Sequence, residues 1–213
     1  MSHSPTTLVL ATGNRHKADE IRALLADVEL RILTLEDFPD FPGVEEDGET
    51  CQANALKKAR ETAIFTGNWA LADDTGLEVQ ALGGRPGVYA ARYAGENAAY
   101  ADNCRKLLEE MKGVPQDKRW ARFVTVIALS DPKGNTELVQ GMLEGTITEK
   151  FYGSQGFGYD PVFFVPEAGK TLAEMTLTEK NQISHRARAL AKAKELLKQR
   201  LIASRKSGRS AAR

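Results

Sequence analysis

The sequence predicts an α/β fold built around a twisted sheet of mixed direction with flanking helices. In the first third of the chain, short apolar strands alternate twice with amphipathic helices, which is the pattern of β-α-β units. Later, two β-rich segments are separated by a short polar turn, which is typical of an antiparallel hairpin. A sheet that contains both kinds of connection must run in mixed directions.

The first β-α unit begins with a buried strand at residues 7–11. The turn at residues 12–14 leads into a helix whose apolar side chains recur on one face. These side chains are Ile21, Leu24, Leu25 and Val28. Residues 30–35 predict the next strand.

The second unit follows an acidic, proline-containing loop at residues 39–48, which we expect to be exposed and mobile. Residues 50–65 predict an amphipathic helix, because small and apolar side chains recur at helical spacing. Residues 69–72 predict a strand that ends at the acidic pair Asp73 and Asp74.

The middle of the chain contains a turn, a helix and the hairpin. Three glycines and a proline indicate a turn at residues 82–87, and residues 97–111 predict a helix. Residues 122–129 and 137–148 predict the two hairpin strands, joined by the turn at residues 131–135.

The C-terminal segment predicts one long helix and a tail. The helix begins near Ser184, which is a suitable N-cap residue. After Ala203 the sequence becomes basic and rich in small residues, which is typical of disorder. We therefore expect one domain over residues 1–201 and a disordered basic tail over residues 202–213.

The composition restricts the class of protein. Lysine plus arginine equals aspartate plus glutamate, 29 of each, so there is no overall positive field to hold a nucleic acid, and we expect no stable nucleic-acid partner. The apolar runs are too short for a membrane helix, so we also expect no membrane association. Cys51 and Cys104 lie far apart and no leader-like segment precedes the first strand, which favours a reduced, cytoplasmic location.

The first segment that could carry chemistry is the turn after the first strand. It combines free backbone N–H groups at a helix start with cationic side chains, an arrangement suited to a polyphosphate. An ordinary β-α turn with solvated charges explains the same residues equally well, because the spacing matches no standard phosphate loop. The residues are Thr12, Gly13, Asn14, Arg15, His16 and Lys17.

The adjacent carboxylates of Asp73 and Asp74 predict a magnesium site, since Mg²⁺ takes one or two protein carboxylates together with phosphate oxygens and water. Asp74 with either Glu45 or Glu46 of the acidic loop would suffice, and one side chain of the pair should face a crevice. The alternatives are turn or capping acids for the pair and a merely solvated charge run for the loop.

Two later segments could complete a nucleotide site. The glycine-rich stretch ends in Phe157, Gly158, Tyr159 and Asp160, where an aromatic ring could stack on a base or simply pack in the core. Lys180, His185 and Arg186 lie close together near a helix start and could bind a base edge or a phosphate, although such cations are usually surface residues. Only three histidines are present and no nucleophile motif is found, so zinc and serine or cysteine chemistry are disfavoured.

Taken in order, five motifs resemble the inosine triphosphate pyrophosphatase family over residues 8–201. They are L-A-T-G-N-x-x-K, A-D-D-T-G-L, L-G-G-x-P-G-V-Y-x-A-R-Y-A-G, G-F-G-Y-D-P-V-F-F and E-K-N-x-I-S-H-R. The resemblance implies an elongated fold with a cleft between two lobes, a homodimer, and hydrolysis of deaminated purine nucleoside triphosphates to the monophosphate and pyrophosphate.

The resemblance also implies roles for individual residues. Asp74 would be the general base and a Mg²⁺ ligand, Glu45 the second ligand, and Lys58 a weaker candidate. The substrate would be bound by Thr12, Gly13, Asn14, Arg15, His16, Lys17, Thr75, Phe157, Gly158, Tyr159, Asp160, Lys180, His185 and Arg186.

The chain departs from the family pattern after the acidic loop. Ala53 stands where a glutamate is usual, which leaves the choice between Glu45 and Glu46 open and suggests compensation by Glu49. Ala90 replaces a frequent serine. Two other functions remain open, a pyrophosphatase of different specificity and a nucleotide- or RNA-binding module without turnover.

Overall fold

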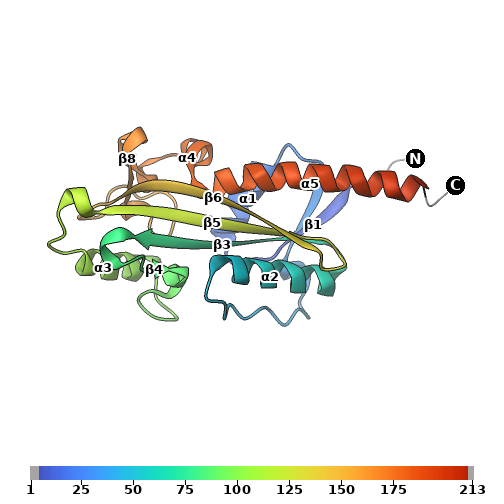
Figure 1. Ribbon diagram of the computed structural model, residues 1–213, viewed down its shortest axis with the longest axis horizontal. Coiled ribbons are helices and arrows are strands. Elements are labelled where there is room, and N and C mark those ends of the chain that lie inside the picture. The colour runs from blue at the N-terminus through green and yellow to red at the C-terminus, as the bar shows by residue number, and fades with distance from the viewer. Residues whose placement is uncertain (1–4, 211–213) are drawn as a thin grey trace.

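The computed structural model describes the backbone of residues 5–210 and the side chains of residues 5–200. A twisted sheet of eight strands runs through the molecule (Figure 1). Its order is β2-β1-β3-β5-β6-β7-β8, with β4 paired to β3. The strands are β1 (Thr6–Leu10), β2 (Leu30–Thr34), β3 (Trp69–Val79), β4 (Pro86–Gly87), β5 (Trp120–Ser130), β6 (Thr136–Ile147), β7 (Phe163–Val165) and β8 (Lys170–Thr171).

The sheet is mixed, as the sequence predicts. Strand β1 pairs in parallel with β2 and β3, whereas β3, β5 and β6 are antiparallel neighbours. The predicted β5–β6 hairpin is confirmed. Its turn is fixed by Asp131, whose Oδ1 accepts hydrogen bonds from Lys133 N at 2.8 Å and from Asn135 N at 3.0 Å.

Helices cover both faces of the sheet, with α2 below and α5 above in Figure 1. α2 packs against β3 and β5, and α5 against β5 and β6. The predicted cap of α5 is confirmed, because Ser184 Oγ accepts a hydrogen bond from Ala187 N at 3.1 Å. The helices are α1 (Arg15–Leu25), α2 (Cys51–Thr66), α3 (Tyr100–Glu110), α4 (Leu177–Ile183) and α5 (His185–Ser210).

Each lobe of the elongated molecule has a large apolar core, and a smaller third cluster contains Cys51, Ala55 and Ala59 of α2 (Figure 1). The first contains Ile21, Leu71 and Leu190 and joins α1, β3 and α5. The second contains Leu77 and Leu107 and joins β3 to α3. Because β3 contributes to both cores, it carries the chain from one lobe to the other, and the two-lobed shape implied by the family resemblance is confirmed.

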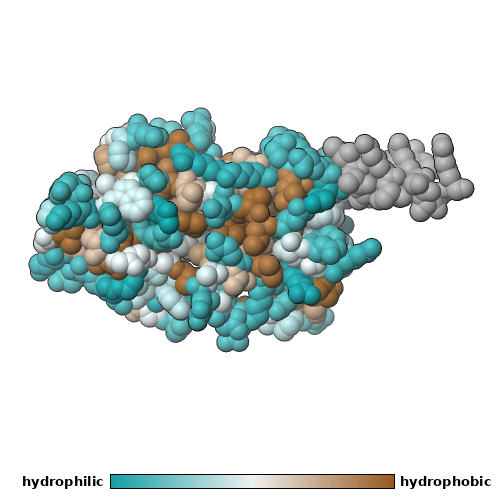
Figure 2. Space-filling view, in the orientation of Figure 1, coloured by the Kyte–Doolittle hydropathy of each residue, from teal (hydrophilic) through white to brown (hydrophobic). Residues whose placement is uncertain are grey.

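The surface in Figure 2 is mainly hydrophilic, with apolar side chains gathered near the middle of the face shown. Strand β6 and the start of α5 lie in this region of Figure 1. Leu138 and Met142 of β6 are among the exposed large apolar residues. Within residues 5–210, no helix is long and apolar enough to cross a membrane.

The predicted end of the third strand is wrong. β3 does not stop before Asp73 but continues to Val79, so the acidic pair lies in the middle of a strand. The continuation is stabilised by antiparallel pairing with β5 and by complete burial of Leu77 and Val79. The two carboxylates can lie inside the sheet because Lys17, Lys58 and Arg186, from helices on both faces, form ion pairs with them.

Three helix boundaries also differ from the prediction. α1 ends at Leu25, before Val28, and α3 begins at Tyr100, because Asp102 Oδ2 accepts a hydrogen bond from Ala99 N and starts the helix there. α5 continues through Ser210, into the segment expected to be disordered. Each residue added to an existing helix gains one hydrogen bond without a new nucleation step. The basic, small-residue composition of the tail therefore did not predict that the helix would continue into it. Residues 211–213 of the expected tail lie outside the described residues.

Candidate active site

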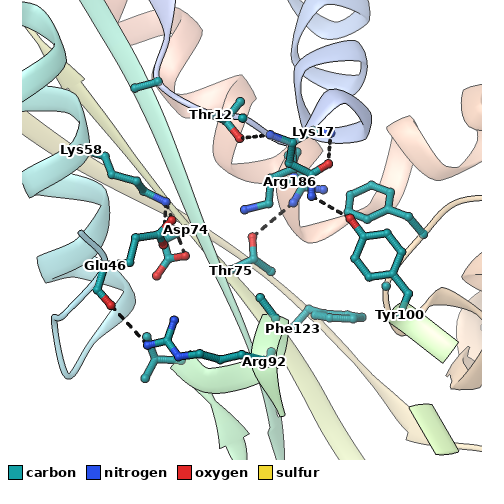
Figure 3. A pocket seen from close by; sticks show the side chains of 18 of the residues that line it. Thr12, Lys17, Glu46, Lys58, Asp74, Thr75, Arg92, Tyr100, Phe123 and Arg186 are labelled. Carbon is teal, nitrogen blue, oxygen red and sulfur yellow. Dashed lines mark hydrogen bonds and ion pairs between the residues drawn. The ribbon is translucent and has the colours of Figure 1, made fainter. Parts of the chain in front are cut away.

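A cavity of about 410 Å³ opens between the two lobes (Figure 3). Most of the residues singled out in the sequence line it, although they come from six separate segments of the chain. They are Thr12, Gly13, Asn14, Lys17, Lys58, Asp74, Thr75, Phe157, Gly158, Tyr159, Asp160, Lys180, His185 and Arg186.

The turn after β1 presents one side of the cavity. Asn14 caps α1, and its Oδ1 accepts a hydrogen bond from Lys17 N at 3.3 Å. Asn14 N donates to Thr12 Oγ1 at 3.2 Å, which tightens the turn. Lys17 lies one helical turn later, and its Nζ is 3.3 Å from Asp73 Oδ2. This helix start therefore provides an anion site with a fixed cation beside it.

Two other residues of this turn lie elsewhere. Arg15 is 85% exposed and pairs with Glu36 at 3.3 Å, so its guanidinium does not line the cavity. His16 stacks on Phe157, with ring centroids 5.3 Å apart and planes inclined by 16°. His16 therefore does not line the cavity itself but contacts Phe157, which does.

Asp73 and Asp74 face opposite sides of the sheet because successive side chains alternate along a strand. Asp73 is completely buried on the α5 side, where its Oδ2 lies 3.2 Å from Arg186 Nη2. Burial alone would raise the pKa of Asp73, but Lys17 and Arg186 outweigh it and hold the pKa well below its usual value. Asp73 is therefore ionised, and its carboxylate holds the side chains of Lys17 and Arg186 in place.

Asp74 faces α2 and the cavity. Asn54 Nδ2 donates to its Oδ2 at 3.3 Å, and Lys58 Nζ lies 3.8 Å from its Oδ1. Burial raises the pKa of Asp74, and although Lys58 lowers it in part, the pKa stays above its usual value. A carboxylate with a raised pKa that faces a cavity is suited to accept a proton.

Lys58 lies between the carboxylates. Its Nζ donates to Asp73 O at 2.9 Å and to Glu46 Oε2 at 3.0 Å. Figure 3 shows Lys58 beside Glu46 and Asp74. Burial alone would lower the pKa of Lys58, but the carboxylates of Asp74, Asp73 and Glu46 hold it above its usual value. The residue that the sequence offered as a weaker candidate is a charged, buried part of the cavity wall.

The acidic loop brings Glu46 to the cavity, whereas Glu45 is exposed and does not line it. Arg92 Nη2 donates to Glu46 O at 3.2 Å, and Gly48 N donates to Asn54 Oδ1 at 2.8 Å, so the loop is fixed at two points. Within the described residues, no three Asp, Glu, His or Cys side chains are grouped closely enough to hold a metal. Two carboxylates facing one cavity fit Mg²⁺, which fills its remaining positions with phosphate oxygens and water.

The opposite wall contains a buried ionic network. Lys180 Nζ donates to Glu20 Oε1 at 2.8 Å and to Asp160 Oδ2 at 2.6 Å. Arg186 contacts Glu20 Oε2 at 2.5 Å and Thr75 Oγ1 at 3.3 Å. Glu20 therefore joins the two cations. Burial alone would raise its pKa, but Arg186 and Lys180 lower it.

The Phe157 loop is held against this network. Asp160 Oδ2 accepts a hydrogen bond from Phe157 N at 2.8 Å, and Lys180 Nζ lies 4.8 Å from the centroid of the Phe157 ring. Gly156 has φ +71°, and a Cβ there would collide with the Asp160 carboxylate, which explains the glycine. The Tyr159 hydroxyl donates a hydrogen bond to Ala90 O at 2.9 Å, which joins the Phe157 loop to the segment around Ala90.

His185 is buried and stacks on Phe123, with ring centroids 4.3 Å apart. Burial, followed by repulsion from Arg186 and Lys180, holds the pKa of His185 well below its usual value, so the ring is neutral near pH 7. Its Nδ1 is buried without a hydrogen-bond partner. The ring therefore forms an apolar wall with Phe123.

Sequence reasoning did not single out five contributors to this site. Glu20 gives a signal, because it is an acid on the buried face of α1. Asn54 and Arg92 lie in or beside family motifs. Phe123 and Tyr100 give no signal, since only the docking of the second lobe brings them to the cavity.

Together, the fold and the cavity define an α/β protein of the nucleotide-binding class, with a helix start suited to an anion at one end of the cavity and aromatic and cationic groups at the other. Residues 8–196 match the Ham1 family. The chain belongs to the Ham1 family, and the resemblance seen in the motifs is confirmed.

Similar proteins cover nearly the whole chain. A dITP/XTP pyrophosphatase of Geobacter sulfurreducens is 54% identical over 90% of this chain and 96% of its own length. One from Desulforamulus reducens is 51% identical over 89% of this chain and 94% of its own length. The solved structure of a HAM1 protein from Coxiella burnetii has a TM-score of 0.83 at 41% identity, covering 91% of this chain and 99% of that one.

Proposed function

We propose that this protein hydrolyses the triphosphates of inosine, deoxyinosine and xanthosine to the monophosphate and pyrophosphate. Membership of the Ham1 family and relatives named dITP/XTP pyrophosphatase support this activity. The observation that carries the proposal is Asp74, a carboxylate of raised pKa that faces a cavity beside the buried cation Lys58. A module that only binds anions would gain nothing from an acid at that place.

In the proposed mechanism the triphosphate binds to the turn at Thr12, Gly13 and Asn14, with Lys17 neutralising part of its charge. Asp74 removes a proton from a water molecule, and that water attacks the α-phosphorus so that pyrophosphate leaves. Lys58 stabilises the ionised form of Asp74. The protonated Asp74 then returns its proton to solvent.

We propose Asp74 and Glu46 as the Mg²⁺ ligands. Glu46 replaces Glu45 in this role because its side chain lines the cavity and shares Lys58 with Asp74. Bound Mg²⁺ would neutralise phosphate charge and orient the reacting group. Ala53, where a glutamate is usual, is offset in this proposal by Asn54, which hydrogen-bonds both Asp74 and the backbone of Gly48.

The base is proposed to bind against Phe157 with the cations Lys180 and Arg186 at its edge. Hypoxanthine and xanthine present a keto oxygen at position 6, which needs donors, whereas adenine presents an amino group. The neutral His185 ring closes the site on one side. Because the side chains of Lys180 and Arg186 are donors only, they favour the deaminated purines.

We also propose, from the family resemblance, one domain over residues 1–201, a homodimer and action in the cytoplasm. Exposed Leu138 and Met142 support an association surface, and the buried free thiols of Cys51 and Cys104 fit a reducing compartment. Light scattering of the purified protein tests the dimer.

One assay tests the activity directly. The purified protein with Mg²⁺ is incubated with inosine, deoxyinosine, xanthosine, adenosine and guanosine triphosphates while pyrophosphate release is followed. The proposal requires release from the first three, loss on chelation and recovery with Mg²⁺. Equal rates on all five would indicate a general nucleotide pyrophosphatase, and binding without release would indicate a nucleotide-binding module.

A further inference from the structure

Tyr100 connects the two ends of the cavity from the opposite lobe. It is the first residue of α3, and its hydroxyl accepts a hydrogen bond from Asn14 Nδ2 at 2.8 Å. Its ring lies 5.7 Å from the Phe157 ring and 6.3 Å from the His16 ring, measured between centroids. One side chain therefore contacts both the proposed phosphate turn and the proposed base loop.

The start of α3 is held in place, so this contact is not that of a loose surface side chain. Asn103 accepts a hydrogen bond from Ala94 N at 2.7 Å and donates one to Ala91 O at 3.0 Å. Cys104 Sγ donates to Gly158 O at 3.3 Å, which joins α3 to the base loop itself. These bonds hold the backbone at the start of α3, which carries Tyr100, in place beside the Phe157 loop.

The hydroxyl has a free proton to give. A phenol near neutral pH has one O–H donor and also accepts, and the Tyr100 oxygen uses its acceptor side for Asn14. Among residues 5–200, no side chain or backbone atom accepts a hydrogen bond from that hydroxyl. The donor lies beside the N-terminal turn of α1, where an anion is favoured. Phosphate oxygens are acceptors only, so they match this group.

We infer that Tyr100 is a substrate-positioning residue that donates its hydroxyl to the phosphate next to the sugar, while its ring covers the sugar between the phosphate turn and the base loop. The inference rests on the proposed function, because it takes the nucleotide to run from the turn to the Phe157 loop. A contact to the phosphate differs from a contact to a sugar hydroxyl, and kinetics separate the two.

The main test compares Tyr100→Phe, which loses only the hydroxyl, with Tyr100→Ala, which also loses the ring. Tyr152→Phe is the matched control, since Tyr152 is 41% exposed and does not line the cavity. Tyr100→Phe should lower kcat/KM by about tenfold for both inosine and deoxyinosine triphosphates, the usual effect of losing a hydrogen bond to a charged group. Tyr100→Ala should lower it further, and Tyr152→Phe should not change it.

Several outcomes would overturn the inference. A loss confined to inosine triphosphate would assign the hydroxyl to the sugar 2′-OH, and activity of Tyr100→Phe within twofold of the wild type would leave no role for it. Calorimetric titration with inosine monophosphate needs no turnover and should show about tenfold weaker binding to Tyr100→Phe. If the wild-type protein bound the monophosphate but released no pyrophosphate from any triphosphate, the proposed function would be wrong. The difference in monophosphate affinity between the wild type and Tyr100→Phe would still test the role of the hydroxyl. Unchanged Tm values of the variants show that they fold.

Discussion

Lys17 and Arg186 contact the same oxygen of one buried carboxylate, Asp73 Oδ2, at 3.3 and 3.2 Å. Lys17 belongs to the proposed phosphate turn and Arg186 to the proposed base-binding wall. A displacement of either cation therefore changes the environment of the other. The two ends of the proposed nucleotide site are joined through Asp73, which does not itself line the cavity.

The first prediction concerns Asp74, the proposed general base. Asp74→Asn should lower kcat by about 10²–10⁴-fold, because the amide cannot accept the proton from water. It should leave the Tm nearly unchanged, since the amide can still accept the hydrogen bond from Asn54 and relieves a charge that burial disfavours. Steady-state pyrophosphate release and thermal unfolding measure the two quantities. Activity near that of the wild type would remove Asp74 from the mechanism.

A second prediction concerns the pH dependence of catalysis. Because the pKa of Asp74 is raised, the acidic limb of kcat/KM should lie above the ordinary aspartate value of 3.8. Lys58 lowers the pKa of Asp74, so Lys58→Gln should move that limb to still higher pH. A mere loss of phosphate affinity would lower the whole profile without moving it, and that result would assign Lys58 to binding alone.

The stability of the fold should also decrease in acid, but through different carboxylates. Asp73 and Glu20 have folded-state pKa values below their unfolded-state values, so their contribution is complete above the unfolded values and is lost as the pH falls towards the folded ones. Asp74 and Asp160 have raised values and become less unfavourable over the same range. Asp73→Asn should therefore flatten the fall in Tm below about pH 4. A Tm profile as steep as that of the wild type would show that Asp73 is not the group that responds.

The fold and the site differ in how far the sequence predicts them. The β1 turn, the hairpin and the cap of α5 depend on local patterns, and all were predictable. The direction of the Asp73 and Asp74 side chains was predictable only in part, since β3 continues through them and sends them to opposite layers. Tyr100 and Asn14 are 86 residues apart in the chain, and only the packing of the two lobes brings them together. No local sequence pattern predicts that contact.

A further prediction compares two neighbours in the proposed phosphate turn. Lys17→Ala should lower kcat/KM by about 10²-fold, because a positioned cation is lost where charge builds on the departing pyrophosphate. Arg15→Ala is the matched control, since Arg15 is 85% exposed and paired with Glu36 outside the cavity. Equal effects of the two substitutions would mean that the turn attracts the substrate only through general charge.

The proposed metal ligands give another prediction. Glu46→Gln should raise the Mg²⁺ concentration needed for half-maximal activity by about tenfold or more, whereas Glu45→Gln should leave it within about twofold. The expected difference follows from placement, because only Glu46 lines the cavity. Titration of activity with Mg²⁺ at saturating substrate measures it. The reverse order would return the role to Glu45 and require the acidic loop to rearrange when the metal binds.

The last prediction concerns how the base is chosen, and it begins with the contacts of Arg186. This guanidinium is buried and bonded to Asp73, Glu20 and Thr75, so alanine there would leave Asp73 with Lys17 alone and Glu20 with Lys180 alone. Removing one partner of a buried ion pair costs about 3–5 kcal/mol, and activity lost with Arg186→Ala would then report unfolding as much as recognition. Arg186→Lys keeps the charge and removes the planar set of donors, which makes it the better variant.

With Arg186→Lys, kcat/KM on inosine triphosphate should fall much more than the residual value on adenosine triphosphate. A buried donor left unpaired costs about 1–3 kcal/mol. In the wild type this cost weakens the binding of adenine, which has no acceptor at position 6, and the cost disappears when the donor is removed. Their ratio should shrink by about tenfold, since about 1.4 kcal/mol corresponds to that factor. Arg188→Lys is the matched control, because Arg188 donates to Met142 O outside the cavity. Equal losses on both substrates would make Arg186 a structural or phosphate residue, and base recognition would then lie in Phe157, Gly158, Tyr159 and Asp160.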